Sequence, residues 1–179
     1  EDVVASIKSR IEFGLTPSIV VGIIDKDGMH FYSFGTKTVG GEPVDEHSIY
    51  EIGSISKTFT ATLLADNIVK GKMKVDDPIY LPASVKVPTY KGGGPPITLG
   101  HLSDHTSSML RMPTNMPESD PTDPAADYTP ELMYAFLSSY ELPREVGSEY
   151  EYSNFAVGVL GQIQALVAGT SYEEALTSV

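Results

Sequence analysis

A change of pattern near Ser54 constrains the fold of this chain more than any other feature of its sequence. Before it, residues 19–24 are β-branched and nearly all apolar, which is typical of a buried strand, and residues 29–34 are rich in aromatic side chains. Residues 25–28, Asp-Lys-Asp-Gly, are typical of a hairpin turn, because Asp-Gly tolerates positive φ. After Ser54 the apolar residues recur at helical spacing. The sequence therefore predicts an α+β chain, with an antiparallel hairpin followed by mostly helical sequence.

Five segments are predicted to be helical. They are residues 3–13, 54–71, 99–104, 130–140 and 155–167. Ala61 and Ala65 let other elements approach the second of these helices closely, which favours its burial on most faces. Thr129 is the expected N-cap of the fourth helix, with Pro130 at its first position, and Gly169 ends the fifth.

Two domains are expected. Residues 1–53 hold the N-terminal helix and the strands of a sheet, and residues 54–179 form a helical domain. Within the second, residues 113–130 contain five prolines and four acidic residues, a composition typical of a solvated loop. Residues 92–94, Gly-Gly-Gly, are not followed by Lys-Ser or Lys-Thr, so they do not match a phosphate-binding loop.

Charge and composition exclude several classes of function. The formal charge is −12, which repels phosphate backbones and anionic headgroups, so no nucleic-acid partner is expected and binding to a membrane surface has little support. The chain has no cysteine, which excludes disulfides, zinc thiolate sites and a cysteine nucleophile. Its apolar runs are far too short for a membrane span, and no signal peptide opens it.

Ser54 and Lys57 form a Ser-x-x-Lys motif, which could activate the serine hydroxyl for catalysis. If Ser54 opens a helix, Lys57 lies one turn on, on the same face, where its amine reaches the serine hydroxyl. A serine hydroxyl is a poor nucleophile until a base removes its proton, and a partly dry site can lower the pKa of a lysine enough for that task. The alternative interpretation is an N-cap serine with a lysine that faces solvent.

Tyr152-Ser153-Asn154 is the second motif, about a hundred residues later. Alternate residues of an extended loop point the same way, so Tyr152 and Asn154 can face one cleft. Tyrosine can hold a proton-transfer position, and asparagine can both donate and accept hydrogen bonds. Alternatively, Tyr152 packs on a core and Asn154 is the N-cap of the helix that starts at Phe155; Asn154 could do both.

A metal site is a weaker alternative. His101 and His105 have the i, i+4 spacing that suits a metal on a helix, and Asp104 is adjacent. The sequence offers no obvious third ligand, so no metal is expected.

Four segments of the chain carry a family resemblance: YEIGSISKTFTA (50–61), GKMKVDDP (71–78), ITLGHLSDHTS (97–107) and YSN (152–154). They resemble segments of the serine β-lactamase-like family, which includes class C β-lactamases, D,D-peptidases (low-molecular-weight penicillin-binding proteins) and related esterases. In chain order, they look like the family's nucleophile segment, the turn after its central helix, its His-Thr-Ser segment and its Tyr-x-Asn motif.

The resemblance implies a role for each matching residue. Ser54 would be the acylated nucleophile, and its backbone N–H would be half of the oxyanion hole. Lys57 and Tyr152 would share the general-base and general-acid steps. Asn154 would orient Lys57 and the amide of a small-molecule or peptide substrate, which could be a β-lactam, a D-amino-acid peptide or an ester. No cofactor is implied, and His101 and His105 would be structural.

The chain also departs from the family pattern. Ser108 stands where the His-Thr-Ser segment usually continues with glycine, and Asp104 replaces a neutral residue. The family's late Lys-Thr-Gly or His-x-Gly strand, which supplies the other oxyanion N–H, does not occur after Asn154. We therefore expect a β-lactamase/transpeptidase-like fold that lacks the C-terminal strands, completed by a second chain, a separate fragment or a swapped partner.

Two other classes of function compete with a full hydrolase. One is a non-catalytic penicillin-binding or sensor-like module, which keeps its acyl adduct. The other is an inactive truncated fragment. If the chain follows the family, its location is periplasmic or extracellular.

Overall fold

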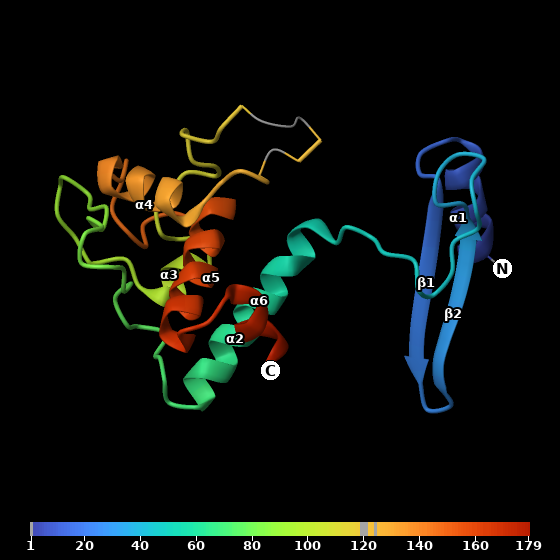
Figure 1. Cartoon of the computed structure of the whole chain (residues 1–179), viewed down its shortest axis with the longest axis horizontal. Coiled ribbons are helices and arrows are strands. Elements are labelled where there is room, and N and C mark those ends of the chain that lie inside the picture. Colours follow the sequence, from blue (N-terminus) through green and yellow to red (C-terminus); the bar gives the residue numbers. More distant parts are fainter. Residues whose placement is uncertain (1, 119–121, 124) are drawn as a thin grey trace. The chain divides into compact units, whose positions relative to one another are not determined.

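The computed structural model describes residues 2–118, 122–123 and 125–179, and it forms two compact units, Glu1–Ile52 and Gly53–Val179 (Figure 1). We call them the strand unit and the helical unit. Residues 119–121 and 124, which belong to the predicted acidic loop, lie outside the described residues.

The strand unit is built around one hairpin. Helix α1 (Asp2–Glu12) is followed by strands β1 (Ser18–Asp25) and β2 (Gly28–Gly35), which pair antiparallel from Ser18↔Gly35 to Asp25↔Gly28. This register leaves a two-residue turn and confirms the predicted hairpin. Gly35 has φ +82°, and a Cβ there would lie 2.2 Å from the Pro17 carbonyl oxygen, so only glycine fits.

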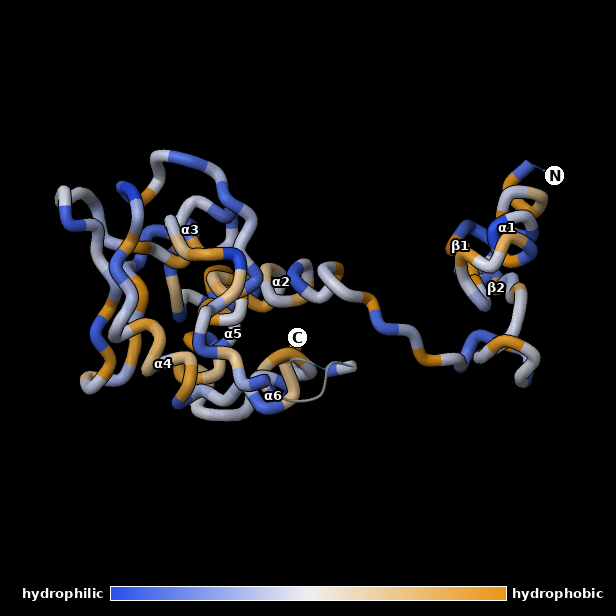
Figure 2. The backbone as a smooth tube through the Cα atoms, turned by 90° about the horizontal axis from the view of Figure 1, so that it is seen from above, coloured by the Kyte–Doolittle hydropathy of each residue, from blue (hydrophilic) through white to orange (hydrophobic). Residues whose placement is uncertain are grey.

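Few side chains of the strand unit are shielded from solvent. Ile7 of α1 and Val44 are its buried hydrophobic residues. The hydroxyls of Ser18 and Tyr50 lie 2.7 Å apart and tie the segment after β2 back to β1. Figure 2 shows hydrophobic and hydrophilic residues interspersed along α1, as the sequence predicts for an amphipathic helix.

The helical unit has a short 3₁₀ turn and five α-helices among its described residues. They are η1 (Gly53–Ile55), α2 (Ser56–Val69), α3 (Leu99–Ser103), α4 (Pro130–Ser139), α5 (Asn154–Ala168) and α6 (Tyr172–Thr177). Helix α5 contacts α2, α3 and α6, and most of its residues are buried (Figure 1). Leu102, Leu137 and Leu160 are fully buried in one continuous core around it.

Helix ends follow the capping signals in the sequence, with one correction and one omission. Thr129 caps α4 by accepting a hydrogen bond from the Leu132 amide, and Gly169 ends α5 in the left-handed conformation, as predicted. Asn154 is not the N-cap of α5: Ser153 is, because its hydroxyl accepts from the Ala156 amide. Helix α6 was not predicted, although a capping box between Ser171 and Glu174 marks its start.

The prediction that the helix after Ser54 is buried on most faces is wrong for this chain. The side chain of Phe59 is 48% exposed and that of Val69 is 86% exposed. Helices α5 and α6 pack against α2, and its buried residues are Thr60, Leu63, Leu64 and Asn67. Among the described residues, no helix is long and apolar enough to cross a lipid bilayer.

Candidate active site

Ser54 and Lys57 meet at the start of the helical unit. Gly53 adopts φ +53° and begins the 3₁₀ turn that carries Ser54 into α2. Lys57 lies one turn further on, and its Nζ donates a hydrogen bond to Ser54 Oγ at 3.1 Å. Ser54 itself is exposed, so a substrate can reach its hydroxyl. In the structure, the side chains of Ser54 and Lys57 therefore lie on the same face, as the Ser-x-x-Lys motif requires.

Tyr152 approaches the same oxygen from the segment before α5. Its hydroxyl donates to Ser54 Oγ at 2.6 Å, although the two residues lie 98 positions apart. Lys57 Nζ lies 4.8 Å from the centroid of the Tyr152 ring. One serine oxygen therefore receives hydrogen bonds from an amine and a phenol, the two groups that could exchange its proton.

The surroundings of Tyr152 favour its ionised form. Hydrogen bonds with Lys57 and Ser54 lower the pKa of the Tyr152 phenol below its usual value, and the charges of Lys57 and Arg111 act in the same direction. The Arg111 guanidinium carbon lies 5.0 Å from the ring centroid. Neither cation has an ion-pair partner among the residues that the structure describes. A phenolate at this position is a base within reach of the Ser54 proton.

Arg111 is a site residue that sequence reasoning missed. A signal was present, because Arg111 is the only lysine or arginine between Lys91 and Arg144. It also follows the His-Thr-Ser segment by a few residues. The sequence could not show that its side chain lies over the ring of Tyr152, since that contact depends on tertiary packing.

Asn154 lies near the other site residues but does not bond to Lys57 within the described chain. Its Nδ2 donates to Met112 Sδ at 3.3 Å. Asn154 and Lys57 both line a cavity of about 380 Å³, whose wall also includes Thr60 and Tyr172. Asn154 thus lines the same space as Lys57, where its side-chain amide could meet a bound ligand.

The two histidines do not share a helix face, because α3 ends at Ser103. His101 Nδ1 accepts a hydrogen bond from the Thr98 amide at 3.2 Å, as part of the capping box of α3. His105 Nδ1 accepts from the Ser153 amide at 3.2 Å. The i, i+4 metal pair is therefore not formed, and the described residues contain no group of three potential metal ligands.

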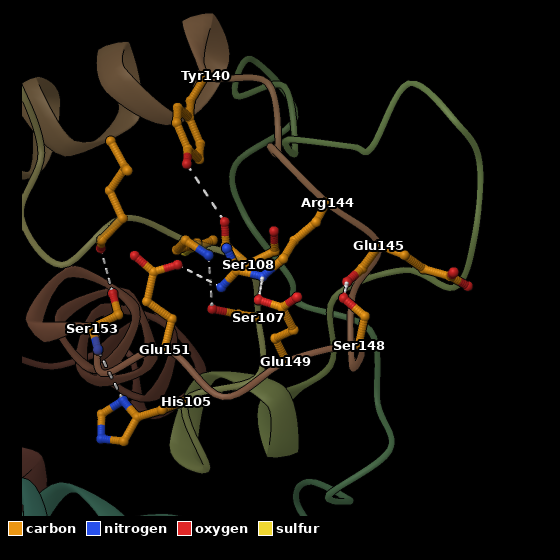
Figure 3. A network of polar contacts seen from close by, with 12 residues as sticks. His105, Ser107, Ser108, Tyr140, Arg144, Glu145, Ser148, Glu149, Glu151 and Ser153 are labelled. Carbon is orange, nitrogen blue, oxygen red and sulfur yellow. Dashed lines mark hydrogen bonds and ion pairs between the residues drawn. The ribbon is translucent and has the colours of Figure 1, made fainter.

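A polar network fixes the segment that leads to Tyr152 (Figure 3). Arg144 forms ion pairs with Glu149 at 3.5 Å and with Glu151, the residue before Tyr152, at 2.5 Å. The Ser153 hydroxyl, just after Tyr152, donates to the Leu110 carbonyl at 2.6 Å. Both neighbours of Tyr152 are thus held by side-chain contacts, which limits the movement of the phenol.

Ser108 lies beside this network in a conformation that favours glycine. Its φ is +63°, and its hydroxyl is buried with no hydrogen-bond partner. Its backbone carbonyl accepts from the Tyr140 hydroxyl at 3.5 Å (Figure 3). Ser108, which stands where the family has glycine, therefore keeps the left-handed backbone conformation. Its buried hydroxyl, however, has no hydrogen-bond partner.

Comparison with known proteins gives consistent results. A family model described as beta-lactamase matches residues 7–178. The chain is similar to a beta-lactamase of Escherichia coli K12, with 28% identity over 96% of this chain and 42% of the relative. It is also similar to the D-alanyl-D-alanine-carboxypeptidase/endopeptidase AmpH of that organism, with 31% identity over 85% of this chain and 39% of the relative. The chain thus spans about two fifths of these curated relatives.

Solved structures share the fold. A class C beta-lactamase from Rhodobacter sphaeroides superposes with a TM-score of 0.76 and 30% identity, over 98% of this chain and 46% of that one. An octameric penicillin-binding protein homologue from Pyrococcus abyssi superposes with a TM-score of 0.78 and 27% identity, over 99% of this chain and 41% of that one. These matches confirm the predicted β-lactamase/transpeptidase-like fold class.

Proposed function

Since the chain belongs to the beta-lactamase family, we propose that it carries the nucleophile part of a serine hydrolase or acyltransferase, in which Ser54 is acylated. One observation carries this proposal: Lys57 and Tyr152 both donate hydrogen bonds to Ser54 Oγ. The substrates we propose are β-lactams, D-amino-acid peptides or small esters, each of which presents a carbonyl carbon to a serine nucleophile.

In the acylation step that we propose, Tyr152 reacts as the phenolate, which accepts the hydrogen bond that the neutral phenol donates. Ser54 Oγ attacks the substrate carbonyl while its proton passes to that phenolate. The positive charges of Lys57 and Arg111 stabilise that phenolate before the transfer. Tyr152 then returns the proton to the leaving group as the carbonyl re-forms, which completes the acyl-enzyme. Deacylation repeats the sequence with water as nucleophile. The Ser54 backbone N–H, in the 3₁₀ turn that precedes α2, would bind the developing oxyanion.

We further propose that a second segment or chain completes this site and supplies the other oxyanion donor. The greater length of the relatives supports this, and so does the exposed apolar side chain of Phe59 on α2. Loss of one oxyanion donor typically lowers the rate by about 10²- to 10³-fold. A fully active, monomeric species of only 19.3 kDa would contradict this part of the proposal.

Turnover assays test the proposed reaction. The protein is offered a chromogenic cephalosporin, a peptide ending in D-Ala-D-Ala and a nitrophenyl ester. We expect hydrolysis of at least one of them, lost in Ser54→Ala and retained in Ser56→Ala, whose hydroxyl bonds to the Gly53 carbonyl instead. Hydrolysis that survives in Ser54→Ala would overturn the proposal.

The lifetime of the adduct separates a hydrolase from a sensor-like module. A hydrolase releases its acyl group and returns to the free mass, whereas a non-catalytic binding module keeps an adduct on Ser54 after the free ligand is removed. We also propose a periplasmic or extracellular location, as the resemblance implies, and fractionation of the source cells tests it. Recovery of the protein in the cytoplasmic fraction would contradict that location.

A further inference from the structure

His105 holds the backbone on both sides of Tyr152. Its carbonyl oxygen accepts a hydrogen bond from the Glu151 amide at 2.8 Å. Its Nδ1 accepts from the Ser153 amide at 3.2 Å, as Figure 3 shows. Tyr152 lies between these two amides in the sequence. His105 therefore holds the backbone that carries the Tyr152 phenol, although the two residues lie 47 positions apart in the sequence.

The imidazole also contacts the phenol ring directly. The ring centroids of His105 and Tyr152 lie 4.5 Å apart at an interplanar angle of 38°. Tyr150 meets the same imidazole edge-on, with centroids 5.7 Å apart. The imidazole thus makes the ring contact with Tyr152 and the hydrogen bond to the Ser153 amide, so its displacement would free the phenol ring and the backbone that follows Tyr152.

This geometry defines the protonation state of the imidazole. An Nδ1 that accepts from an amide carries no proton, so the neutral ring must hold its N–H on Nε2. Protonation would turn Nδ1 into a donor facing the Ser153 N–H, and the hydrogen bond would be lost. The same ring would then carry a charge close to Lys57.

The groups around His105 favour the neutral form on balance. Burial, followed by the charge of Lys57, lowers the pKa of the imidazole, and Asp104 opposes that shift. The other titratable or charged groups nearby are Tyr150 and Tyr152 on its ring, Arg111 over the ring of Tyr152, and Glu151, whose carboxylate is paired with Arg144. A folded-state pKa below the ordinary value of about 6.5 keeps the ring neutral at physiological pH.

The backbone of His105 shows how strongly this position is constrained. Its φ is +66°, in the left-handed region that asparagine tolerates better than other residues with a Cβ. Such a conformation costs free energy and persists only where the surrounding contacts hold it. Asparagine at this position could keep both the backbone conformation and an acceptor oxygen, whereas alanine could keep neither.

We propose that neutral His105 is a positioning residue for Tyr152, holding its phenol on Ser54, and that protonation of the imidazole releases it. The inference rests on the proposed function, because it assigns His105 a task in the acylation of Ser54. His105 touches no reacting atom and acts through Tyr152 alone. Two measurements test it, and the first does not depend on enzymatic activity.

The first measurement is ¹⁵N NMR of the histidine rings in the whole protein, with His105 assigned by substitution. At about pH 7.5 we expect Nδ1 to be unprotonated and Nε2 to carry the proton. The Ser153 amide signal should titrate together with the imidazole as the pH falls. A protonated Nδ1, or a Ser153 amide that does not follow the imidazole, would overturn the proposal.

The second measurement is the acylation rate of Ser54 against pH, in wild type and three variants. In wild type the logarithm of the rate should fall with a slope of about two below the pKa of His105, because Tyr152 and His105 must both be deprotonated. His105→Asn should keep a slope of about one and lie within about threefold of wild type at about pH 7.5. His105→Ala should lose about tenfold, the equivalent of the one hydrogen bond that the imidazole accepts from the Ser153 amide.

His101→Asn is the matched control, because the His101 side chain bonds to Thr98 in the capping box of α3; its profile should match wild type. Thermal melting separates a misfolded His105→Ala from a folded but slow one, and His105→Asn decides the question in either case. A slope of two that persists in His105→Asn would overturn the proposal. Absence of acylation in wild type would overturn the proposed function instead, while the NMR result would still decide the role of His105.

Discussion

The helical unit and the strand unit differ in how much of their apolar surface they bury. In the helical unit, Leu102, Leu137 and Leu160 are fully buried in a core that surrounds α5. In the strand unit, Ile24 is 80% exposed and Met29 is 68% exposed, although both lie in the hairpin. A two-stranded sheet without a covering layer is marginally stable in water. The helical unit therefore has a core of its own, whereas the strand unit by itself buries only Ile7 and Val44 among its hydrophobic residues.

This difference matters for the site. Ser54, Lys57 and Tyr152 all belong to the helical unit, as do His105 and Arg111. These residues thus share the unit whose core surrounds α5. The strand unit offers apolar side chains that further structure could cover, in agreement with the second segment proposed above.

The largest expected contrast is in hydrogen exchange. Amides of α5 at Leu160 and Ile163 should exchange at least about 10³-fold more slowly than the paired amides of β1 and β2, because their exchange requires opening of the buried core. Exchange measured by mass spectrometry on the 179-residue chain gives this ratio. Equal protection of α5 and the hairpin would contradict the proposed difference in burial between the two units.

Substitutions in the two units should differ by several kcal/mol. Leu137→Ala should lower the free energy of unfolding by about 2–5 kcal/mol, because it leaves a cavity in a fully buried site. Ile24→Ala, at a side chain 80% exposed, should change it by less than about 0.5 kcal/mol. Urea denaturation monitored by circular dichroism measures both. An equal loss in the two variants would show that the hairpin is buried in solution.

Alkaline pH should destabilise the helical unit through a partly buried tyrosine. Burial raises the pKa of Tyr128 to about 12, above the ordinary value of about 10. The contribution of Tyr128 to the free energy of unfolding is therefore complete below about pH 10, and it is lost as the pH rises towards 12. Urea midpoints should fall over this range in wild type and fall less in Tyr128→Phe. Tyr80→Phe, at a side chain 65% exposed, should leave the fall unchanged; a reduced fall there would contradict the assignment.

The smallest effect is expected at Ser108 and should be a gain. Ser108→Gly should raise the free energy of unfolding by about 1 kcal/mol, because it relieves the positive φ and removes an unsatisfied buried hydroxyl. Ser107→Gly is the matched control: Ser107 is buried, lacks a positive φ and accepts from the Met109 amide, so its loss should destabilise. Thermal melting compares the two. Destabilisation by Ser108→Gly would mean that the serine makes a stabilising contact.

Local patterns in the sequence predicted the parts of the fold that depend on neighbours along the chain. The hairpin, the Thr129 cap and the Gly169 end are of this kind. The capping box that begins at Ser171 was equally local and was overlooked, and the cap at Ser153 was placed one residue late.

Contacts between distant segments were harder to predict. The Ser-x-x-Lys and Tyr-x-Asn motifs predicted Ser54, Lys57 and Tyr152 as site residues. No local pattern predicts that Arg111 and His105 lie against Tyr152. Those contacts depend on how the segment after α3 packs beside the start of α5. For the same reason, the alanines of α2 predicted close approach but could not specify which faces would be covered.

The most direct test of the account is intact mass after incubation with an acylating β-lactam, followed by mapping of the modified peptide. We predict a single adduct on Ser54, absent in Ser54→Ala and formed far more slowly in Tyr152→Phe. It should form at the wild-type rate in Tyr150→Phe, because Tyr150 is 68% exposed and phenylalanine keeps its ring. An adduct that maps to another residue, or that forms equally in Ser54→Ala, would contradict the account.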